Sequence, residues 1–538
     1  MKLLGLGKYP IKTGGQIQGI IKSAGLVIMT GLTLMLGACG GGSHHDDSVT
    51  AQTTEGTING FVESGVRQFR GIPYASPPVG ALRWMPPTAA AKRSQILDTK
   101  SYRSDCAQSN TLGVFGNPST SEDCLYANIF TPKEVKTPLP VMVWIHGGGN
   151  FNGSGSHYDG SKLVRDGNTV VVTFNYRVNI FGFFAHPAIT AEGHANSNYG
   201  IMDQQQLLRW VKQNIANFGG DPNNVTIFGE SAGGFNVMAH YVAPASNGLF
   251  QKAISESSPN GVVEQPLPTL AAAEAIGQNA INNTGCTVQT ADCLRSLTAQ
   301  QLLQIGGDNL YSVGVIVDGT IIPESFITAI DNGNISNVPL LVGLNKDEWN
   351  FFAALDPSLE VAPGTYAARI NTAYGANAAA VLAQYPEANY PSPSQALVAT
   401  ITDSSFACST HRIMRKMVQH VPVYAYEFAD RTAPSYAPES TFLPHLAAHT
   451  LEMQYLFPLY KGGSGVAKAL NASQEILSND MVSYWTNFAK SGTPNAGTVP
   501  TWPAYDLVGE SVQSLQLPRP QTITNFADSH NCALWDSI

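Results

Sequence analysis

Charged residues are scarce in this sequence, and basic residues are not in excess. Asp, Glu, Lys and Arg make up 13% of the 538 residues, and 30 Lys and Arg stand against 39 Asp and Glu. The formal net charge of −9 argues against a protein that binds nucleic acid, so we expect no such partner. With 43% hydrophobic residues and no internal repeat, the chain is also not disordered, coiled-coil or collagen-like.

No apolar run near the start of the chain is long enough to span a membrane comfortably. Residues 1–23 contain four Lys and no acid, and an apolar run of about 15 residues, 24–38, then ends at Cys39. This pattern is typical of an export signal. Its end, Leu36-Gly37-Ala38-Cys39, resembles a bacterial lipoprotein box, which implies lipidation of Cys39. We therefore predict a signal peptide over 1–38, a flexible tether over 39–50 and one domain over 51–538. An ordinary signal peptide or a single-span anchor is the alternative.

Cysteine is also rare, with seven residues in the chain. If Cys39 carries lipid, an even number remains, and an exported protein can form three disulfides. Six cysteines allow fifteen pairings, and buried free thiols are the alternative. The candidates are Cys106, Cys124, Cys286, Cys293, Cys408 and Cys532.

Short apolar runs separated by helical stretches indicate the fold class. Runs of this length are typical of strands buried on both faces of a mostly parallel sheet. Residues 200–218 repeat apolar side chains at helical spacing. We predict one large α/β domain with a mostly parallel central sheet, helices on both faces and insertions. The predicted strands are 141–145, 170–174, 225–228, 340–343 and 423–426.

A candidate nucleophile follows the third of these runs. Gly229-Glu230-Ser231-Ala232-Gly233 matches G-x-S-x-G between a predicted strand and a predicted helix, the context of a nucleophile elbow. Glycine is needed there because the serine sits on a strained turn with a helix close by. The sequence therefore predicts Ser231 as a nucleophile.

A glycine-rich loop follows the first apolar run. In His146-Gly147-Gly148-Gly149-Asn150, backbone N–H groups can approach the oxygen that becomes negative during acyl transfer. We expect Gly148, Gly149 and Ala232 to form the oxyanion hole, and His146 to be structural. The loop lacks the Lys-Ser/Thr of a phosphate-binding Walker loop and the spacing of a dinucleotide fingerprint.

Further blocks along the chain resemble the type-B carboxylesterase/lipase family, which includes the cholinesterases. The resemblance implies an α/β-hydrolase fold and disulfides 106–124, 286–293 and 408–532. It also implies structural ion pairs Arg70–Glu122 and Arg177–Asp203. The blocks are Phe69-Arg70-Gly71-Ile72-Pro73-Tyr74-Ala75, Pro77-Pro78-Val79-Gly80, Leu82-Arg83-Trp84, Ser121-Glu122-Asp123-Cys124-Leu125-Tyr126, Asn175-Tyr176-Arg177 and Asp203-Gln204-Gln205.

The remaining members of a catalytic triad follow from the order Ser, acid, His in this fold. Glu348 resembles the family's acid, with Asp347 as the competitor, and Trp349 stands where the family usually has Gly. His449-Thr450-Leu451-Glu452 resembles the family's H-G-x-E block, which favours His449 over His445 as the base.

These residues predict a serine carboxylesterase that acts through an acyl-enzyme on Ser231. No metal-ligand spacing occurs, and we expect no metal or cofactor. Choline esters are not the expected substrate, because the Cys106–Cys124 loop has no Trp and only Phe115 as an aromatic residue. We expect small or aromatic esters, synthetic ones included, as substrates of an envelope protein that is lipid-anchored, at the outer membrane or cell surface. A catalytically silent binding protein of this fold and a lipase for longer acyl chains are the alternatives.

Overall fold

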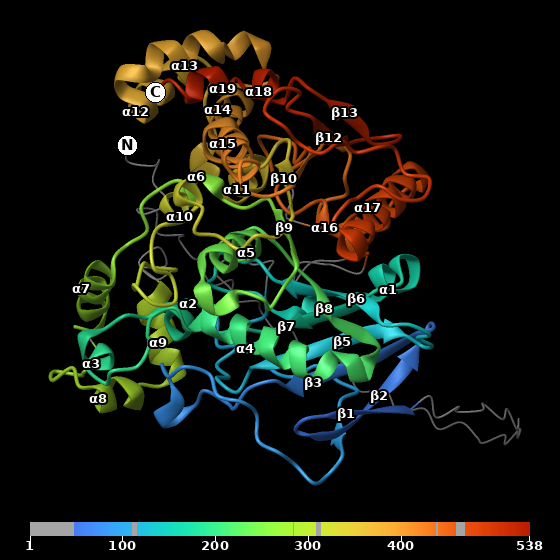
Figure 1. Ribbon diagram of the computed structural model, residues 1–538. Helices are drawn as coiled ribbons and strands as arrows, with labels where there is room; N and C mark the ends of the chain where they lie inside the picture. Colours follow the sequence, from blue (N-terminus) through green and yellow to red (C-terminus); the bar gives the residue numbers. More distant parts are fainter. Residues whose placement is uncertain (1–47, 110–115, 283, 308–313, 437–439, 459–467) are drawn as a thin grey trace, which may run out of the picture.

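The computed structural model describes residues 48–109, 116–282, 284–307, 314–436, 440–458 and 468–538 (Figure 1). Cys39 and the predicted signal peptide therefore lie outside the described residues. The predicted tether ends earlier than residue 50, since Ser48, Val49 and Thr50 already pair with Phe61, Gly60 and Asn59 of the next strand. Across the described residues, no helix has the length and apolar character needed to cross a membrane.

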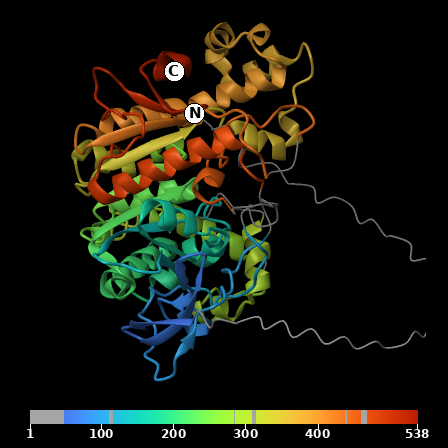
Figure 2. The same ribbon diagram turned by 90° about the vertical axis from the view of Figure 1, so that its right-hand side faces the viewer.

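One large sheet runs through the molecule, as the stack from blue to red in Figure 2 shows. Its strand order is β1-β2-β3-β5-β7-β6-β8-β9-β10-β11-β12-β13, and β4 pairs with β2. The strands from β7 to β12 in this order are parallel, and those at either end are antiparallel. The strands are β1 Ser48–Thr53, β2 Gly56–Glu63, β3 Val66–Pro73, β4 Leu97–Asp98, β5 Tyr126–Pro132, β6 Leu139–Ile145, β7 Val170–Phe174, β8 Gly220–Glu230, β9 Lys252–Glu256, β10 Leu340–Asn345, β11 Val423–Phe428, β12 Val512–Leu515 and β13 Gln521–Ile523.

The helices connect and cover these strands. A π-helical turn, Asp403–Ala407, joins α14 to α15 without a break. The helices are α1 Ser161–Gly167, α2 Asn179–Phe183, α3 Pro187–Thr190, α4 Tyr199–Asn214, α5 Ala232–Val242, α6 Asn260–Val263, α7 Leu270–Ile281, α8 Ala291–Ser296, α9 Ala299–Gly307, α10 Phe326–Asn332, α11 Trp349–Leu355, α12 Tyr366–Tyr374, α13 Ala378–Gln384, α14 Pro393–Thr402, α15 Cys408–Met417, α16 Met453–Leu456, α17 Ala472–Ser491, α18 Phe526–Ser529 and α19 Cys532–Trp535.

Apolar side chains on both faces of the sheet explain the continuous apolar runs in the sequence. Along β6, Val141 and Val143 join a core with residues of α4, α5, α10 and α15, whereas Met142 and Trp144 join a second core with residues of α1, α16 and α17. Alternate residues of a strand point to opposite faces, so both sets are buried at once. The predicted α/β class, the five predicted strands and helices on both faces are thus confirmed.

A third apolar core lies at one end of the molecule, at the top of Figure 1, where α12, α13, α14 and α19 gather. Tyr366, Tyr385 and Leu397 pack there with Trp535, three residues from the end of the chain. The carboxyl-terminal residues are therefore packed against helices that precede them by more than a hundred positions.

The three expected disulfides, Cys106–Cys124, Cys286–Cys293 and Cys408–Cys532, are present. The expected Arg177–Asp203 pair is also present and buried, with two N···O distances of 2.8 Å.

The expected Arg70–Glu122 pair is wrong. Arg83 binds Glu122 instead, through Nε and Nη2 at 2.6 and 2.5 Å. Arg70 points from β3 toward Gln68 and lies over the rings of Phe61 and Tyr102. Arg70 and Arg83 lie in separate blocks of the family resemblance, and the folded chain directs Arg83 toward Glu122.

Candidate active site

Ser231 occupies a sharp turn between β8 and α5. Its backbone angles are φ 58° and ψ −124°, a combination that non-glycine residues rarely adopt. The strand ends at Glu230 and the helix begins at Ala232, so the whole change of direction falls on Ser231. This is the geometry of the nucleophile elbow predicted from the sequence.

The glycines of this motif permit close backbone approach. A Cβ on Gly233 would lie 2.0 Å from the carbonyl oxygen of Ile145, and one on Gly229 would lie 2.6 Å from the same oxygen. Any side chain at either position would separate the elbow from the end of β6. The motif therefore seats the start of α5 directly against the glycine-rich loop.

The glycine-rich loop 146–150 also passes close to Ser231. A Cβ on Gly147 would lie 3.1 Å from the Ser231 Cβ, and Gly148 and Gly149 adopt positive φ angles of 96° and 65°. In the part of the chain that the structure describes, the N–H groups of Gly148, Gly149 and Ala232 donate to no protein acceptor. Free donors beside a nucleophile are the requirement for an oxyanion hole.

His146 supports this loop from within the core. It stacks on Tyr176 with ring centroids 4.2 Å apart, and its Nδ1 lies 2.9 Å from the Gly147 oxygen. Burial lowers the pKa of His146 to about 4, so the ring is neutral. These contacts agree with the structural role expected for it.

Glu348 and His449 meet although they are 101 positions apart in the chain. The Nδ1 of His449 lies 2.5 Å from Oε2 of Glu348, and both side chains are buried. The other carboxylate oxygen of Glu348 accepts the N–H of Asn345 at 2.7 Å. Glu348 is thereby held at the end of β10 and can orient the imidazole and stabilise its charged form.

The competing acid is engaged elsewhere. Asp347 accepts two hydrogen bonds from Arg431, each 2.8 Å long, and one from the N–H of Ala447. Glu348, and not Asp347, is thus the candidate acid that lies within hydrogen-bond distance of His449.

The other ring nitrogen of His449 faces the elbow. Its Nε2 lies 3.2 Å from Oε1 of Glu230, without the alignment of a hydrogen bond. Among the described residues Nε2 has no hydrogen-bond partner, so the Ser231 hydroxyl is not bonded to it in this structure. Catalytic hydrogen bonds are often long or absent without substrate. The structure thus joins His449 to Glu348 and places its free nitrogen against the residue that precedes Ser231.

Several buried acids gather behind the elbow. Burial raises the pKa of Glu230 well above its usual range, and the carboxylates of Glu452, Glu348 and Glu256 add to this effect. Burial, with a smaller effect of Glu348, raises the pKa of Glu452 to about 8. Burial also raises the pKa of Glu256, although Trp485 donates to it. Protonation is therefore favoured at Glu230, Glu256 and Glu452, which limits the negative charge buried beside His449.

In the sequence, Glu230 and Glu452 stand out only as members of the motifs around Ser231 and His449, and Glu256 lies outside any motif. Glu256 lies beside Glu230 because β8 and β9 pair in parallel and in register at their last residues. The sequence held a signal for this pair of acids, because β8 and β9 both end in Glu.

Aromatic rings surround the imidazole. The ring centroids of Phe352, Phe406 and Phe351 lie 4.9, 5.5 and 6.2 Å from that of His449. Trp349 packs on Phe352 and Phe406 at 4.9 and 6.2 Å. The replacement of the family's usual Gly by Trp349 thus adds a ring to an aromatic cluster beside His449.

Thr450, which stands where the family's H-G-x-E block has Gly, is a second departure from the family pattern, and its backbone conformation is unfavourable. Thr450 has a φ of 72°, where a glycine is favoured and a β-branched residue is an outlier. A hydrogen bond with Tyr436 holds its hydroxyl.

Phe115, the aromatic residue of the first disulfide loop, lies outside the described residues. Among the residues that are described, no cluster of three His, Cys, Asp or Glu side chains could hold a metal ion.

Known proteins resemble this chain over most of its length. The model of the carboxylesterase family matches residues 46–535. Para-nitrobenzyl esterase of Bacillus subtilis (strain 168) is 36% identical over 491 residues, which cover 89% of this chain and 96% of that protein. Human cocaine esterase is 33% identical, over 88% of this chain and 87% of its own, and fumonisin B1 esterase of Sphingopyxis macrogoltabida is 34% identical, over 89% of each.

Solved structures agree with the sequence comparison. A thermophilic PNB esterase matches with a TM-score of 0.75 and 32% identity, over 90% of this chain and 99% of its own. The predicted α/β-hydrolase fold is therefore confirmed. A family match over nearly the whole domain, together with relatives named for ester hydrolysis, leads to one conclusion: this chain belongs to the carboxylesterase family and is a carboxylic-ester hydrolase.

Proposed function

We propose that the protein hydrolyses esters through an acyl-enzyme on Ser231, with His449 as the base and Glu348 as the acid. The observation that carries this proposal is the 2.5 Å contact between Glu348 and His449 beside the strained turn at Ser231. A serine on such a turn, next to an oriented imidazole and free backbone donors, can perform acyl transfer without a cofactor.

In this reaction His449 takes the proton of the Ser231 hydroxyl at Nε2 while the oxygen attacks the ester carbonyl carbon. The N–H groups of Gly148, Gly149 and Ala232 stabilise the resulting oxyanion. The bond to the alcohol oxygen then breaks, and His449 returns the proton to the departing alcohol. Water attacks the acyl-enzyme by the same route, which releases the acid and restores Ser231.

We further propose that small and aromatic esters, including synthetic ones, are the preferred substrates. The rings of Phe352, Phe406 and Trp349 beside His449 favour flat apolar groups. Relatives named for para-nitrobenzyl esters and for cocaine support the same substrate class.

We also propose that the enzyme is exported and held at the bacterial envelope by lipid on Cys39. The short apolar run that ends in Leu36-Gly37-Ala38-Cys39 supports this location. Bacterial lipoproteins carry several acyl chains, and more than one chain is required for stable anchoring.

A panel of p-nitrophenyl esters of increasing acyl length, together with a p-nitrobenzyl ester, tests the substrate class. We expect acetate, butyrate and the aromatic ester to have higher kcat/KM than palmitate. The reverse order, with activity on emulsified triglyceride, would identify a lipase instead.

The nucleophile is tested by labelling and substitution. A fluorophosphonate should modify Ser231, as located by mass spectrometry, and Ser231→Ala should remove nearly all turnover in a folded protein. Near-normal turnover of that variant would refute the assignment.

A further inference from the structure

One short segment, Thr402 to Ala407, contacts the base of the proposed triad and the residue that directly follows its acid. The Oγ1 of Thr402 accepts the N–H of Trp349 at 3.1 Å, and Trp349 directly follows Glu348. Phe406, which is 3% exposed, lies 5.5 Å from the His449 ring and also packs on Phe352. The position of this segment therefore affects both partners of the Glu348–His449 hydrogen bond.

The backbone of this segment is unusual. Asp403–Ala407 forms a π-helical turn, in which the N–H of Cys408 donates to the carbonyl of Asp403. Such turns are rare inside α-helices and frequently occur at functional sites. A turn that departs from the regular helix needs contacts outside the helix to hold it in place.

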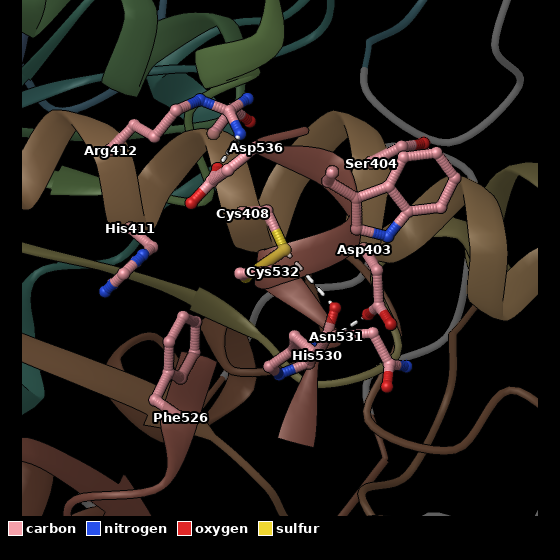
Figure 3. Close-up of a disulfide and its surroundings, with 12 residues drawn as sticks. Asp403, Ser404, Cys408, His411, Arg412, Phe526, His530, Asn531, Cys532 and Asp536 are labelled. Atoms are coloured by element: carbon pink, nitrogen blue, oxygen red, sulfur yellow. Dashed lines mark hydrogen bonds and ion pairs between the residues drawn. A yellow bond between two sulfur atoms is a disulfide. The ribbon is translucent and has the colours of Figure 1, made fainter. Parts of the chain in front are cut away.

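The carboxyl-terminal residues supply these contacts, as Figure 3 shows. Nδ1 of His530 lies 2.6 Å from Oδ1 of Asp403, the first residue of the turn. Two residues further on, Cys532 forms a disulfide with Cys408, the residue that follows the turn. The other oxygen of Asp403 accepts the Tyr385 hydroxyl at 2.7 Å.

His530 is itself fixed on its second nitrogen. Its Nε2 lies 2.6 Å from Oε1 of Glu427 on β11, so the imidazole bridges two buried carboxylates. His530 is 3% exposed, Asp403 6% and Glu427 1%. Charge-assisted hydrogen bonds in such a setting are short and strong. Without His530, Asp403 would keep the Tyr385 hydroxyl and Glu427 would keep the Lys346 ammonium at 2.9 Å, but each buried carboxylate would lose its imidazole partner.

We propose that His530 is a positioning residue for the triad. It binds Asp403 and thereby fixes the π-helical turn, so that Thr402 and Phe406 hold Glu348 and His449 in their reactive arrangement. This proposal rests on the proposed roles of Glu348 and His449 and adds a residue that touches neither substrate nor reacting atoms.

The test compares kcat per active site in His530→Gln and in the wild-type enzyme. Sites are counted by stoichiometric fluorophosphonate labelling of Ser231, so unfolded protein does not enter the rate. We expect kcat to fall about 10- to 100-fold, because displacements near 1 Å cost this much, while KM changes less than about twofold.

His186→Gln is the matched control. His186 is also buried, at 2% exposed, and also uses both ring nitrogens, toward Ala188 N–H and Gln289. It lies at the start of α3, away from the elbow. Whatever the change in melting temperature, we expect the kcat per labelled site of His186→Gln to stay at the wild-type value.

Two further variants keep the proposal testable if His530→Gln does not fold. Phe406→Leu removes the ring beside His449, and Thr402→Val removes the acceptor of the Trp349 N–H at nearly constant volume. Both should lower kcat per site. In a double-mutant cycle, Phe406→Leu should add little to the effect of His530→Gln, because both act on one path.

Two results would overturn the proposal. The first is a kcat per site within twofold of wild type, either in His530→Gln or in both Phe406→Leu and Thr402→Val. The second is a double variant whose loss of kcat equals the product of the losses in His530→Gln and Phe406→Leu alone. Failure of the proposed triad is distinguishable, because it would show as labelling at a residue other than Ser231 or as full activity in His449→Ala.

Discussion

Gly233→Ala is a substitution for which the structure predicts a large effect on the candidate active site from one added methyl group. The new Cβ would lie 2.0 Å from the Ile145 oxygen and 3.0 Å from the His146 oxygen. Ordinary contact begins at 3.4 Å, so the start of α5 and the end of β6 must separate by about 1.4 Å. Both contacted atoms belong to the backbone and cannot rotate away.

This separation acts on the reaction and on stability. Ile145 leads into the glycine-rich loop, so Gly148 and Gly149 would move relative to Ala232 and Ser231. Displacement of about 1 Å can cost about 100-fold in rate, and overpacking of this kind costs about 1–3 kcal/mol of unfolding free energy. We expect kcat/KM for p-nitrophenyl acetate to fall at least about 100-fold, with a lower urea midpoint.

Gly314→Ala is the control, because a Cβ there meets nothing within 4 Å and the backbone has no positive φ. Its kcat/KM and urea midpoint should equal those of the wild type. A Gly233→Ala enzyme with wild-type kcat/KM would show that the elbow and the oxyanion loop can separate without harm, and the proposed arrangement of the oxyanion hole would then be wrong.

Three further predictions concern the base, the pH dependence of stability and the anchor. His449→Ala should abolish turnover, whereas His445→Ala should retain a substantial fraction; the opposite pattern in kcat would reverse the assignment of the base. Burial disfavours a charged His530, but the charges and hydrogen bonds of its two carboxylates outweigh this and raise its pKa to about 10. Because the folded pKa exceeds the unfolded value of about 6.5, the stabilisation is complete below that pH and is lost as the pH rises toward 10. Between pH 7 and 9, the free energy of unfolding measured with urea should therefore fall by about 1.4 kcal/mol per pH unit more in the wild type than in His530→Gln. Equal pH slopes of the unfolding free energy in the two proteins would contradict this prediction. Cys39→Ser should release the enzyme from membranes or leave it uncleaved with Ser231 still labelled, whereas a soluble wild-type enzyme with an unmodified start beyond residue 39 would favour simple secretion.

Features set by short stretches of sequence were predictable. The apolar strands of the parallel centre are buried on both faces and therefore read as continuous runs, whereas most strands of the antiparallel end mix apolar and polar residues and were not predicted. Ser231 was identified because the flanking glycines and the strand before it are local requirements of the turn. Glu348 and His449 were found only by resemblance to a family, since nothing local relates residues 101 positions apart.

What depends on the path of the chain could not be predicted. Arg83 rather than Arg70 binds Glu122, because the pairing depends on which guanidinium the folded backbone directs toward that carboxylate. Glu256 joins Glu230 through strand register. The contact of His530 with Asp403 links residues 127 positions apart through a π-helical turn that no sequence pattern announced. The sequence alone thus determined the fold class and the class of ester hydrolase, and it predicted Ser231 as the nucleophile, since these depend on local backbone and residue type. Only the tertiary structure decided which charges meet, because buried ion pairs are selected by the direction of side chains in a packed core and not by their spacing along the chain.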